Sequence, residues 1–286
     1  MPIRQMNLSA PSVRGARRPW GRWALRGVAL TWVIGMVLLP VSALVESGLR
    51  DGARAFWREV TSPIAFAALE LTLLSALMMT AINMALGTLT AYVLVRYRFP
   101  GNRLLDSLID LPFAIPTLVT GLMLVALYGP QHPPGAWFEQ AGAQIIFARP
   151  GIVLALLFVT YPFVIRSVQP VLLEIDPAQE EAAWTLGASR RRTFAQIILP
   201  AIAPAILSGA LLSFARALGE FGAIVIVAGN IPRSTLTAPV YIYGQIESQN
   251  QRGASAVSLV LLALSFGVRL AAEWLLGRRG RAYVAG

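Results

Sequence analysis

Six stretches of the chain are apolar over about 20 residues or more, the length that spans the roughly 30 Å hydrocarbon core of a membrane as an α-helix. They run over about 23–45, 67–95, 108–128, 151–171, 201–228 and 254–276. Because lipid offers no hydrogen-bond partners, a crossing segment must satisfy its backbone polar groups internally, as a helix does. The pattern therefore predicts an all-α integral membrane protein with six transmembrane helices.

The composition agrees with a chain that faces lipid. Hydrophobic residues make up 56% of the 286 residues and charged residues only 13%, whereas a soluble domain carries about 25% charged residues. We expect one membrane domain over 23–276, with a short segment 1–22 before it and a tail 277–286 after it. The first apolar stretch exceeds the roughly 7–15 residues of a signal-peptide core, so we expect it to remain as an uncleaved helix.

All 24 basic residues are arginines, because the chain contains no lysine. With the N-terminus inside, 16 arginines fall on inner segments and 6 on outer loops. Since basic residues accumulate on the cytoplasmic side, we expect both termini to be cytoplasmic. The formal charge of +10 could suggest nucleic acid as a partner. The arginines gather at the ends of apolar runs, which favours membrane lipid headgroups and no nucleic acid.

The residue inventory excludes several catalytic chemistries. A P-loop needs a lysine for the terminal phosphates, so any ATP must be bound by a partner. The chain has no cysteine for a thiolate nucleophile or a thiolate-bound metal. Its single histidine, His132, stands in a Gly- and Pro-rich turn, which argues against a His metal site or a Ser-His triad. We expect no catalytic residue, no metal site and no cofactor in this chain.

A polar segment at about 174–200 separates the fourth and fifth apolar stretches. Asp176 precedes a proline at the N-cap position of a helix, and Gln179 follows the cap at capping-box spacing. Gly187 is placed to end this helix, and Ser189 can cap a second one. We expect a helix–turn–helix at the cytoplasmic face, whose mixture of acidic and apolar side chains suits docking into a partner's groove.

The same segment resembles the EAA loop of permease subunits in bacterial ABC importers. The resemblance is carried, at the full spacing of that loop, by Glu181, Ala182, Ala183, Gly187, Ile197, Leu199 and Pro200. It implies that residues 181–187 form a coupling helix, which enters a cleft in a separate ATP-binding subunit. The alternative is an amphipathic helix that rests on lipid headgroups, although such a helix does not require the glycine and the distal Leu-Pro.

The resemblance covers about residues 60–275. The segments that are similar to the sulfate/thiosulfate permease, T-type subunit, are 95–101, 104–116, 162–170 and 214–222. The molybdate permease shares much of this similarity. Three features favour the sulfate type: the extra N-terminal helix, the Thr-Ser-Pro entry at 61–63 and the tail around 249–266. Segment 241–245 is instead closer to the molybdate type.

This resemblance implies a type I permease fold of an ABC importer in the bacterial inner membrane. It also implies ATP-binding subunits, a second permease subunit that is a paralogue, and a periplasmic sulfate/thiosulfate-binding protein. Two alternatives stay open. The chain could be a molybdate/tungstate permease, or an ATP-independent secondary transporter or channel, for which the cytoplasmic loop would have no partner.

The fifth stretch combines small residues with two charges. The small residues are four apart and therefore share one helix face that permits close helix packing: Ala205, Gly209, Ser213 and Ala217. Arg216 and Glu220 stand beside this face, and Arg216 falls about 22 Å in from residue 201 at a rise of 1.5 Å per residue. Ionisable residues at such depth are by default functional hypotheses. The pair could line the pathway of an oxyanion, or the two charges could neutralise each other as a structural pair.

Two prolines, Pro112 and Pro116, lie near the start of the third stretch. A proline removes a helical hydrogen bond and clashes with the preceding turn, so we expect a bend or an interruption there. The interruption is either a kink that neighbouring helices accommodate or a broken helix that lines a cavity.

Overall fold

The computed structural model describes residues 19–284, with side chains described from Trp23 to Ala271. The expected N-terminal segment 1–22 therefore lies almost wholly outside the described residues, and so do the side chains of the expected tail. The chain divides into two units, Met1–Glu46 and Ser47–Gly286. Each unit is described separately below.

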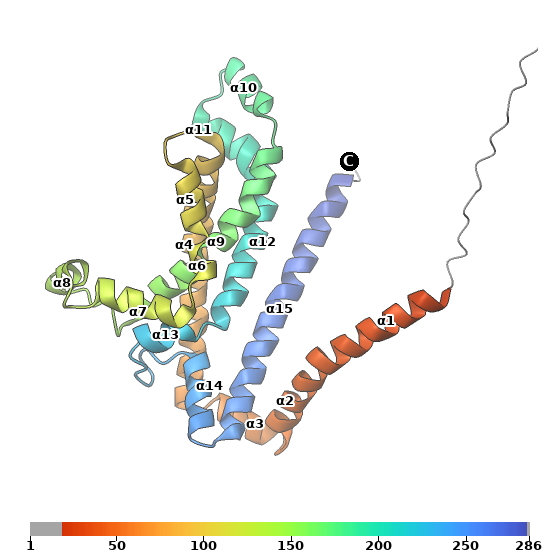
Figure 1. Ribbon diagram of the computed structural model, residues 1–286, viewed down its shortest axis with the longest axis vertical. Coiled ribbons are helices and arrows are strands. Elements are labelled where there is room, and N and C mark those ends of the chain that lie inside the picture. The colour runs from red at the N-terminus through yellow and green to blue at the C-terminus, as the bar shows by residue number, and fades with distance from the viewer. Residues whose placement is uncertain (1–18, 285–286) are drawn as a thin grey trace, which may run out of the picture. The chain divides into compact units, whose positions relative to one another are not determined.

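The first unit is helical over its described residues. In chain order it contains α1 (Pro19–Val33), the π-helical turn η1 (Ile34–Leu38) and the start of α2 (Leu39–Leu49). From Trp23 to Leu49 this continuous helix has 27 residues and is long and apolar enough to cross a membrane (Figure 1). The first apolar stretch thus forms the helix that the sequence predicts.

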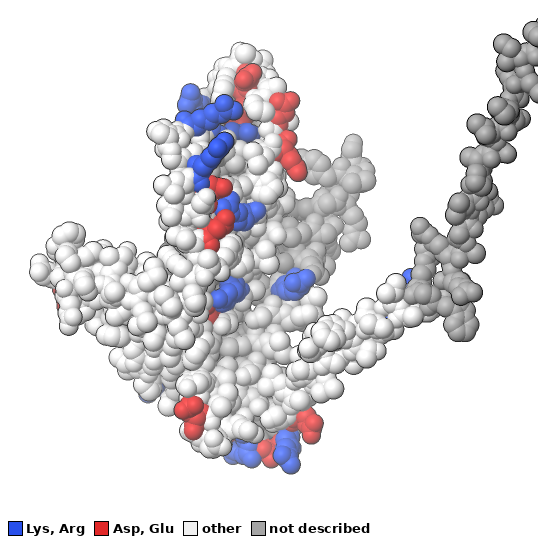
Figure 2. Space-filling model, viewed as in Figure 1, with Lys and Arg blue, Asp and Glu red and all other residues white. Residues whose placement is uncertain are grey.

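Three long helical runs form the centre of the second unit, and each packs against the other two (Figure 1). They are α4 (Pro63–Arg96), α9 (Arg149–Glu174) and the continuous run of α11 (Arg190–Thr193), η2 (Phe194–Ile198) and α12 (Leu199–Leu218). Charged side chains lie at both ends of this unit, and on the face in view they extend from the end that carries α10 to about half its height, above a mostly uncharged zone (Figure 2). Charges at the ends of apolar helices are typical of helices that cross lipid.

Glycines let α4 and α12 approach α9 closely. A Cβ atom at Gly87 of α4 would lie 2.9 Å from the Val164 Cβ, and one at Gly209 of α12 would lie 2.7 Å from the Val164 Cα. Both distances are shorter than van der Waals contact, so only glycine fits. Ser213 and Ala217, further along the face of Gly209, are buried. The close helix approach predicted from the small-residue spacing is therefore confirmed.

The third apolar stretch is interrupted, as its prolines predict. It forms α5 (Asn102–Ile109), α6 (Leu111–Ala114) and α7 (Thr117–Tyr128). The α5–α6 part and α7 are bent by 114° relative to each other. Ile115 is extended because the following proline disfavours helical geometry at the residue before it. The described residues hold five helices able to cross a membrane, or six if this bent pair is one span.

The expectation of one helix over 201–228 is wrong. The helix α12 ends at Leu218, and α13 (Gly222–Val227) begins after a short break. Within the break, the Glu220 carboxylate accepts a hydrogen bond from the backbone N–H of Ala223 at 2.9 Å. This bond satisfies one of the free N–H groups of a helix start, so Glu220 stabilises the beginning of α13 and does not continue α12.

The short helix α13 packs against α7 through two glycines. A Cβ atom at Gly121 of α7 would lie 2.8 Å from the carbonyl oxygen of Ala223, and a side chain at Gly222 of α13 would collide with Thr117. The two backbones therefore meet almost directly. This contact fixes the direction of α7 after the bend.

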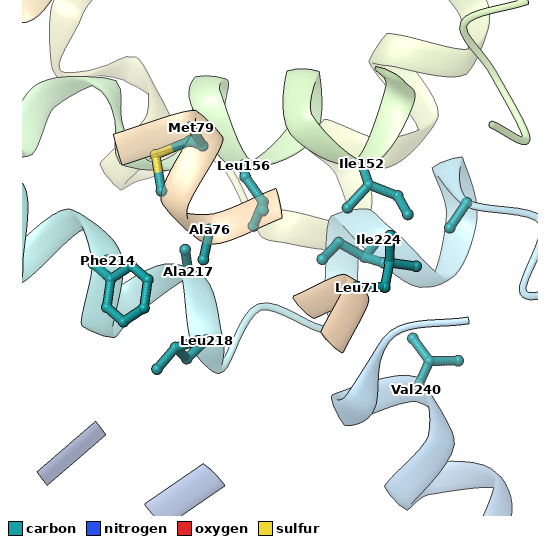
Figure 3. Close-up of a cluster of buried hydrophobic side chains, with 11 residues drawn as sticks. Leu71, Ala76, Met79, Ile152, Leu156, Phe214, Ala217, Leu218, Ile224 and Val240 are labelled. Carbon is teal, nitrogen blue, oxygen red and sulfur yellow. The ribbon is translucent and has the colours of Figure 1, made fainter. Parts of the chain in front are cut away.

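The remaining helices of the second unit are α3 (Ala53–Val60), α8 (Pro133–Gln140), α10 (Pro177–Thr185), α14 (Ala238–Glu247) and α15 (Gln251–Val284). The helix α15 contacts α3, α12 and α14, and α14 also contacts α4. An apolar cluster joins α4, α9, α12, α13 and α14, and includes Met79, Leu156 and Phe214 (Figure 3). The core therefore holds together segments that are far apart in the sequence.

Candidate functional site

The polar segment between α9 and α12 folds as the helix–turn–helix that the sequence predicts. The Asp176 carboxylate accepts a hydrogen bond from the Ala178 N–H at 2.9 Å and caps α10. Gly187 follows the helix with φ of +83°, a left-handed conformation that favours glycine. The Ser189 hydroxyl accepts a bond from the Arg192 N–H at 3.3 Å and caps α11. The predicted roles of Asp176, Gly187 and Ser189 are confirmed.

One surface of α10 is open to a partner. Its exposed or half-buried residues include Glu181, Ala182, Ala183 and Trp184. Leu186, just after the helix, is 88% exposed. The guanidinium of Arg190 lies 5.9 Å from the centroid of the Trp184 ring, within cation–π range. A short helix that presents an acid, an aromatic ring and an aliphatic side chain can dock into a groove of another protein.

The distal residues of the motif, Leu199 and Pro200, lie at the start of α12 and outside α10. The Leu199 N–H donates to the carbonyl of Phe194, five residues back, which makes a π-helical turn. Pro200 has no N–H for the usual bond to the carbonyl four residues before it, and this accounts for the wider turn. Both residues are exposed, whereas the adjacent Ile198 is buried. Pro200 therefore shapes the wider turn through which the loop enters α12.

Sequence reasoning missed a buried ion pair behind the motif. Glu180 is buried although its neighbour Glu181 is exposed. Its Oε1 lies 2.8 Å from Nε of Arg96, the last residue of α4. Nothing in the local pattern distinguishes the two glutamates, because the partner stands far away in the sequence. The two neighbouring acids thus face different environments.

Arg216 and Glu220 form an ion pair across the break that follows α12. Arg216 Nη1 lies 2.8 Å from Glu220 Oε2, with side-chain exposures of 37% and 1%. The other carboxylate oxygen of Glu220 accepts the bond from Ala223 already described. The carboxylate is therefore fully engaged inside the protein, and the guanidinium stays partly open. Arg216 and Glu220 therefore form the ion pair that the structural alternative predicts. The remaining N–H donors of Arg216 could still bind an anion.

A second charged cluster, also missed from the sequence, joins α5 and α6 to α9. Arg166 donates from Nε and Nη2 to the two carboxylate oxygens of Asp110, at 2.8 and 2.6 Å. Its Nη1 donates to Asp106 at 2.7 Å and to Gln169 at 2.6 Å. A two-pronged arginine–carboxylate contact is among the strong hydrogen-bonded pairs. The cluster therefore ties the bent third segment to α9.

An apolar cavity of about 530 Å³ lies between α4, the bent third segment and α9. Two buried polar atoms of its lining residues, Asn83 Oδ1 and Thr120 Oγ1, have no hydrogen-bond partner. The other lining residues are almost all apolar, and Arg216 is not among them. An oxyanion in such a cavity would lose most of its hydration, and the few hydroxyl and amide groups of the lining, such as the Thr120 hydroxyl, would replace only a small part of those hydrogen bonds. This cavity is therefore unsuited to anion passage.

The chain belongs to the family described as binding-protein-dependent transport system inner membrane component, whose model matches residues 83–281. It is thus an integral membrane permease subunit of an ABC transporter, and it lies in the inner membrane. The sulfate transport system permease protein CysT of Escherichia coli is 42% identical over 258 residues, which cover 90% of this chain and 93% of that protein. A probable CysT protein of Chlorokybus atmophyticus is 44% identical over 262 residues, or 92% and 90% of the two chains.

Solved structures share the fold. A chain of a bacterial alginate ABC transporter superposes with a TM-score of 0.76 at 19% identity, covering 91% of this chain and 95% of that chain. A chain of the MetNI methionine ABC transporter gives a TM-score of 0.57 at 18% identity, with 75% and 95% covered. The predicted helical ABC permease fold is therefore confirmed.

Proposed function

We propose that the chain is a permease subunit of an ATP-driven importer that carries sulfate or thiosulfate into the cell. The observation that carries this proposal is the similarity to proteins named as sulfate transport system permeases. Three of them are between 39% and 44% identical to this chain, over at least 90% of its length. The similarity therefore extends over nearly the whole chain, beyond the segment of the EAA loop.

In this proposal, α10 docks into a cleft of an ATP-binding subunit on the cytoplasmic side. The exposed Glu181, Trp184 and Leu186 support this role, because they offer a partner both charge and apolar area. The chain has no lysine for a P-loop, so the partner binds and hydrolyses the ATP. No cofactor is assigned to the permease itself.

The anion pathway is proposed to run between this chain and a second permease subunit, a paralogue. Support comes from the apolar cavity of this chain, which cannot hold an oxyanion well. Arg216 is proposed to line that pathway, since its guanidinium is only partly engaged by Glu220. A periplasmic sulfate/thiosulfate-binding protein would select the substrate and deliver it.

Uptake of radiolabelled sulfate tests the proposal. The chain is expressed with its partner subunits in cells that lack their own sulfate importer. We expect uptake that stops on ATP depletion and that excess thiosulfate inhibits. Uptake of molybdate without sulfate would move the assignment to the molybdate/tungstate alternative. Uptake that persists without ATP, with no ATP-binding subunit recovered in mild detergent, would identify a secondary transporter or channel.

A further inference from the structure

The last turn of α4 holds α10 by contacts that the exposed docking surface does not use. The Arg96 side chain contacts both α10 and the short linker that precedes it. Its Nε lies 2.8 Å from Glu180 Oε1, and its Nη2 donates to the carbonyl of Ile175 at 3.2 Å. The side chains of Arg96 and Glu180 are 14% and 7% exposed. The pair is therefore largely shielded from water, where an ion pair is least screened.

A second contact supports the first from one turn earlier in α4. The ring of Tyr92 meets the ring of Phe194 edge to face, with centroids 5.2 Å apart at an interplanar angle of 76°. Phe194 opens η2, the turn that leads from the loop into α12. The end of α4 thus touches both arms of the helix–turn–helix, α10 through Arg96 and η2 through Tyr92.

The two adjacent glutamates of α10 lie on different faces of the helix. Successive residues of an α-helix point in directions about 100° apart. Glu180 is accordingly buried against Arg96, whereas Glu181 is exposed on the surface open to a partner. One carboxylate therefore belongs to the connection within the chain, and the other is available to the partner.

We propose that Arg96 and Glu180 are positioning residues that transmit movement of α10 to α4. This inference rests on the proposed function, since it requires that α10 docks on an ATP-binding subunit. Removing either partner would leave a buried charge without its counterion, so the pair resists separation when α10 is displaced. The helix α4 continues for 34 residues and packs against α9 and α12. A displacement at Arg96 is thereby passed to the whole helical centre.

The test compares Glu180→Gln, Arg96→Lys and the exchanged pair Arg96→Glu/Glu180→Arg in the complete transporter. Three quantities are measured: assembled complex, ATP hydrolysis and sulfate import per ATP hydrolysed. Glu180→Gln keeps the size of the side chain but removes its charge. Arg96→Lys keeps the charge, but a single ammonium group does not reproduce the separate contacts of Nε with Glu180 and of Nη2 with Ile175. We expect both to assemble and to import less sulfate per ATP, by about tenfold or more, since small misplacements cost that much. The exchanged pair should recover much of the ratio.

Arg98→Gln is the matched control, because Arg98 is exposed and stands only two residues after Arg96. It should leave the import-to-hydrolysis ratio unchanged. A purely structural pair would lower the amount of assembled complex without changing the ratio, and that result overturns the inference. A Glu180→Gln variant with a wild-type ratio also overturns it. If the wild-type complex hydrolyses ATP without importing sulfate, the proposed function fails first and the inference fails with it.

Discussion

Arg216 and Glu220 form an ion pair, but they differ in exposure and in how many of their polar atoms are bonded within the chain. Glu220 is 1% exposed and uses both carboxylate oxygens within the chain, one for Arg216 and one for the start of α13. Arg216 is 37% exposed and meets that carboxylate through Nη1. Because a guanidinium has five N–H donors, most of its capacity stays free. The glutamate fixes the arginine in place, and the arginine can still receive a ligand.

Truncating either residue and then both tests this difference. Arg216→Ala should lower the stability and therefore the yield of folded protein, because it leaves the buried Glu220 carboxylate without its counterion. The loss of stability should be smaller than the about 3–5 kcal/mol for breaking a fully buried pair, since Arg216 is partly exposed. The double variant Arg216→Ala/Glu220→Ala should recover much of the yield, while sulfate uptake stays abolished. Membrane-inserted protein and uptake are measured for each variant. Recovery of uptake together with yield would show that the pair is structural only.

At the level of helices and turns, the sequence predicts features that depend on neighbouring residues, but it does not predict those that depend on contacts between distant segments. The caps at Asp176 and Ser189 and the interruption at Pro116 each depend on a few neighbouring residues, and the structure contains all three. The break after Leu218 was missed although Gly219 follows it, because a single glycine is tolerated within an apolar helix and Glu220 fits a helix by spacing. It depends on α13 meeting α7, which is a tertiary contact.

The ion pairs of the site were missed from the sequence for the same reason. The partners in the pairs Arg96–Glu180 and Arg166–Asp110 stand on different helices, and only the tertiary fold brings them together. No periodicity links such distant positions. The motif itself could be recognised because its residues are close in sequence, but its connection to the helical centre could not.

The turn after α10 offers a matched pair of glycine substitutions. Gly187 and Gly142 both have left-handed φ, of +83° and +78°, with open space at the Cβ position. A valine costs about 1–2 kcal/mol in that conformation at either site. Gly187→Val should in addition weaken binding of the ATP-binding subunit and lower uptake, whereas Gly142→Val should do neither. Co-purification and uptake measure the difference, and equal behaviour of the two variants would contradict the docking role of this turn.

At the scale of the second unit, the two ends of α4 meet different parts of the chain. Its first residues lie near α3 and α14, and its last residue contacts the helix–turn–helix. A helix of 34 residues is about 51 Å long at 1.5 Å per residue, which is enough to cross a membrane. The ends of the unit must therefore face opposite compartments if α4 crosses the membrane along its length.

Labelling of single cysteines can assign those compartments, because the chain has no native cysteine. The arginine distribution predicts that Ser189 is cytoplasmic. An impermeant thiol reagent applied outside intact cells should then label Ser248→Cys, in the exposed turn after α14, and spare Ser189→Cys. Both should react once the membrane is opened. Labelling of Ser189→Cys from outside would reverse the predicted orientation.

The cluster around Arg166 has a consequence for how the chain is made. Asp106 and Asp110 leave the ribosome before their cation, since Arg166 follows Asp110 by 56 residues. At about 5–20 residues per second, the carboxylates wait roughly 3–11 s for their partner. During that interval the third segment cannot adopt its final contact with α9. The contact between the third and fourth segments is therefore completed only after the fourth segment has been synthesised.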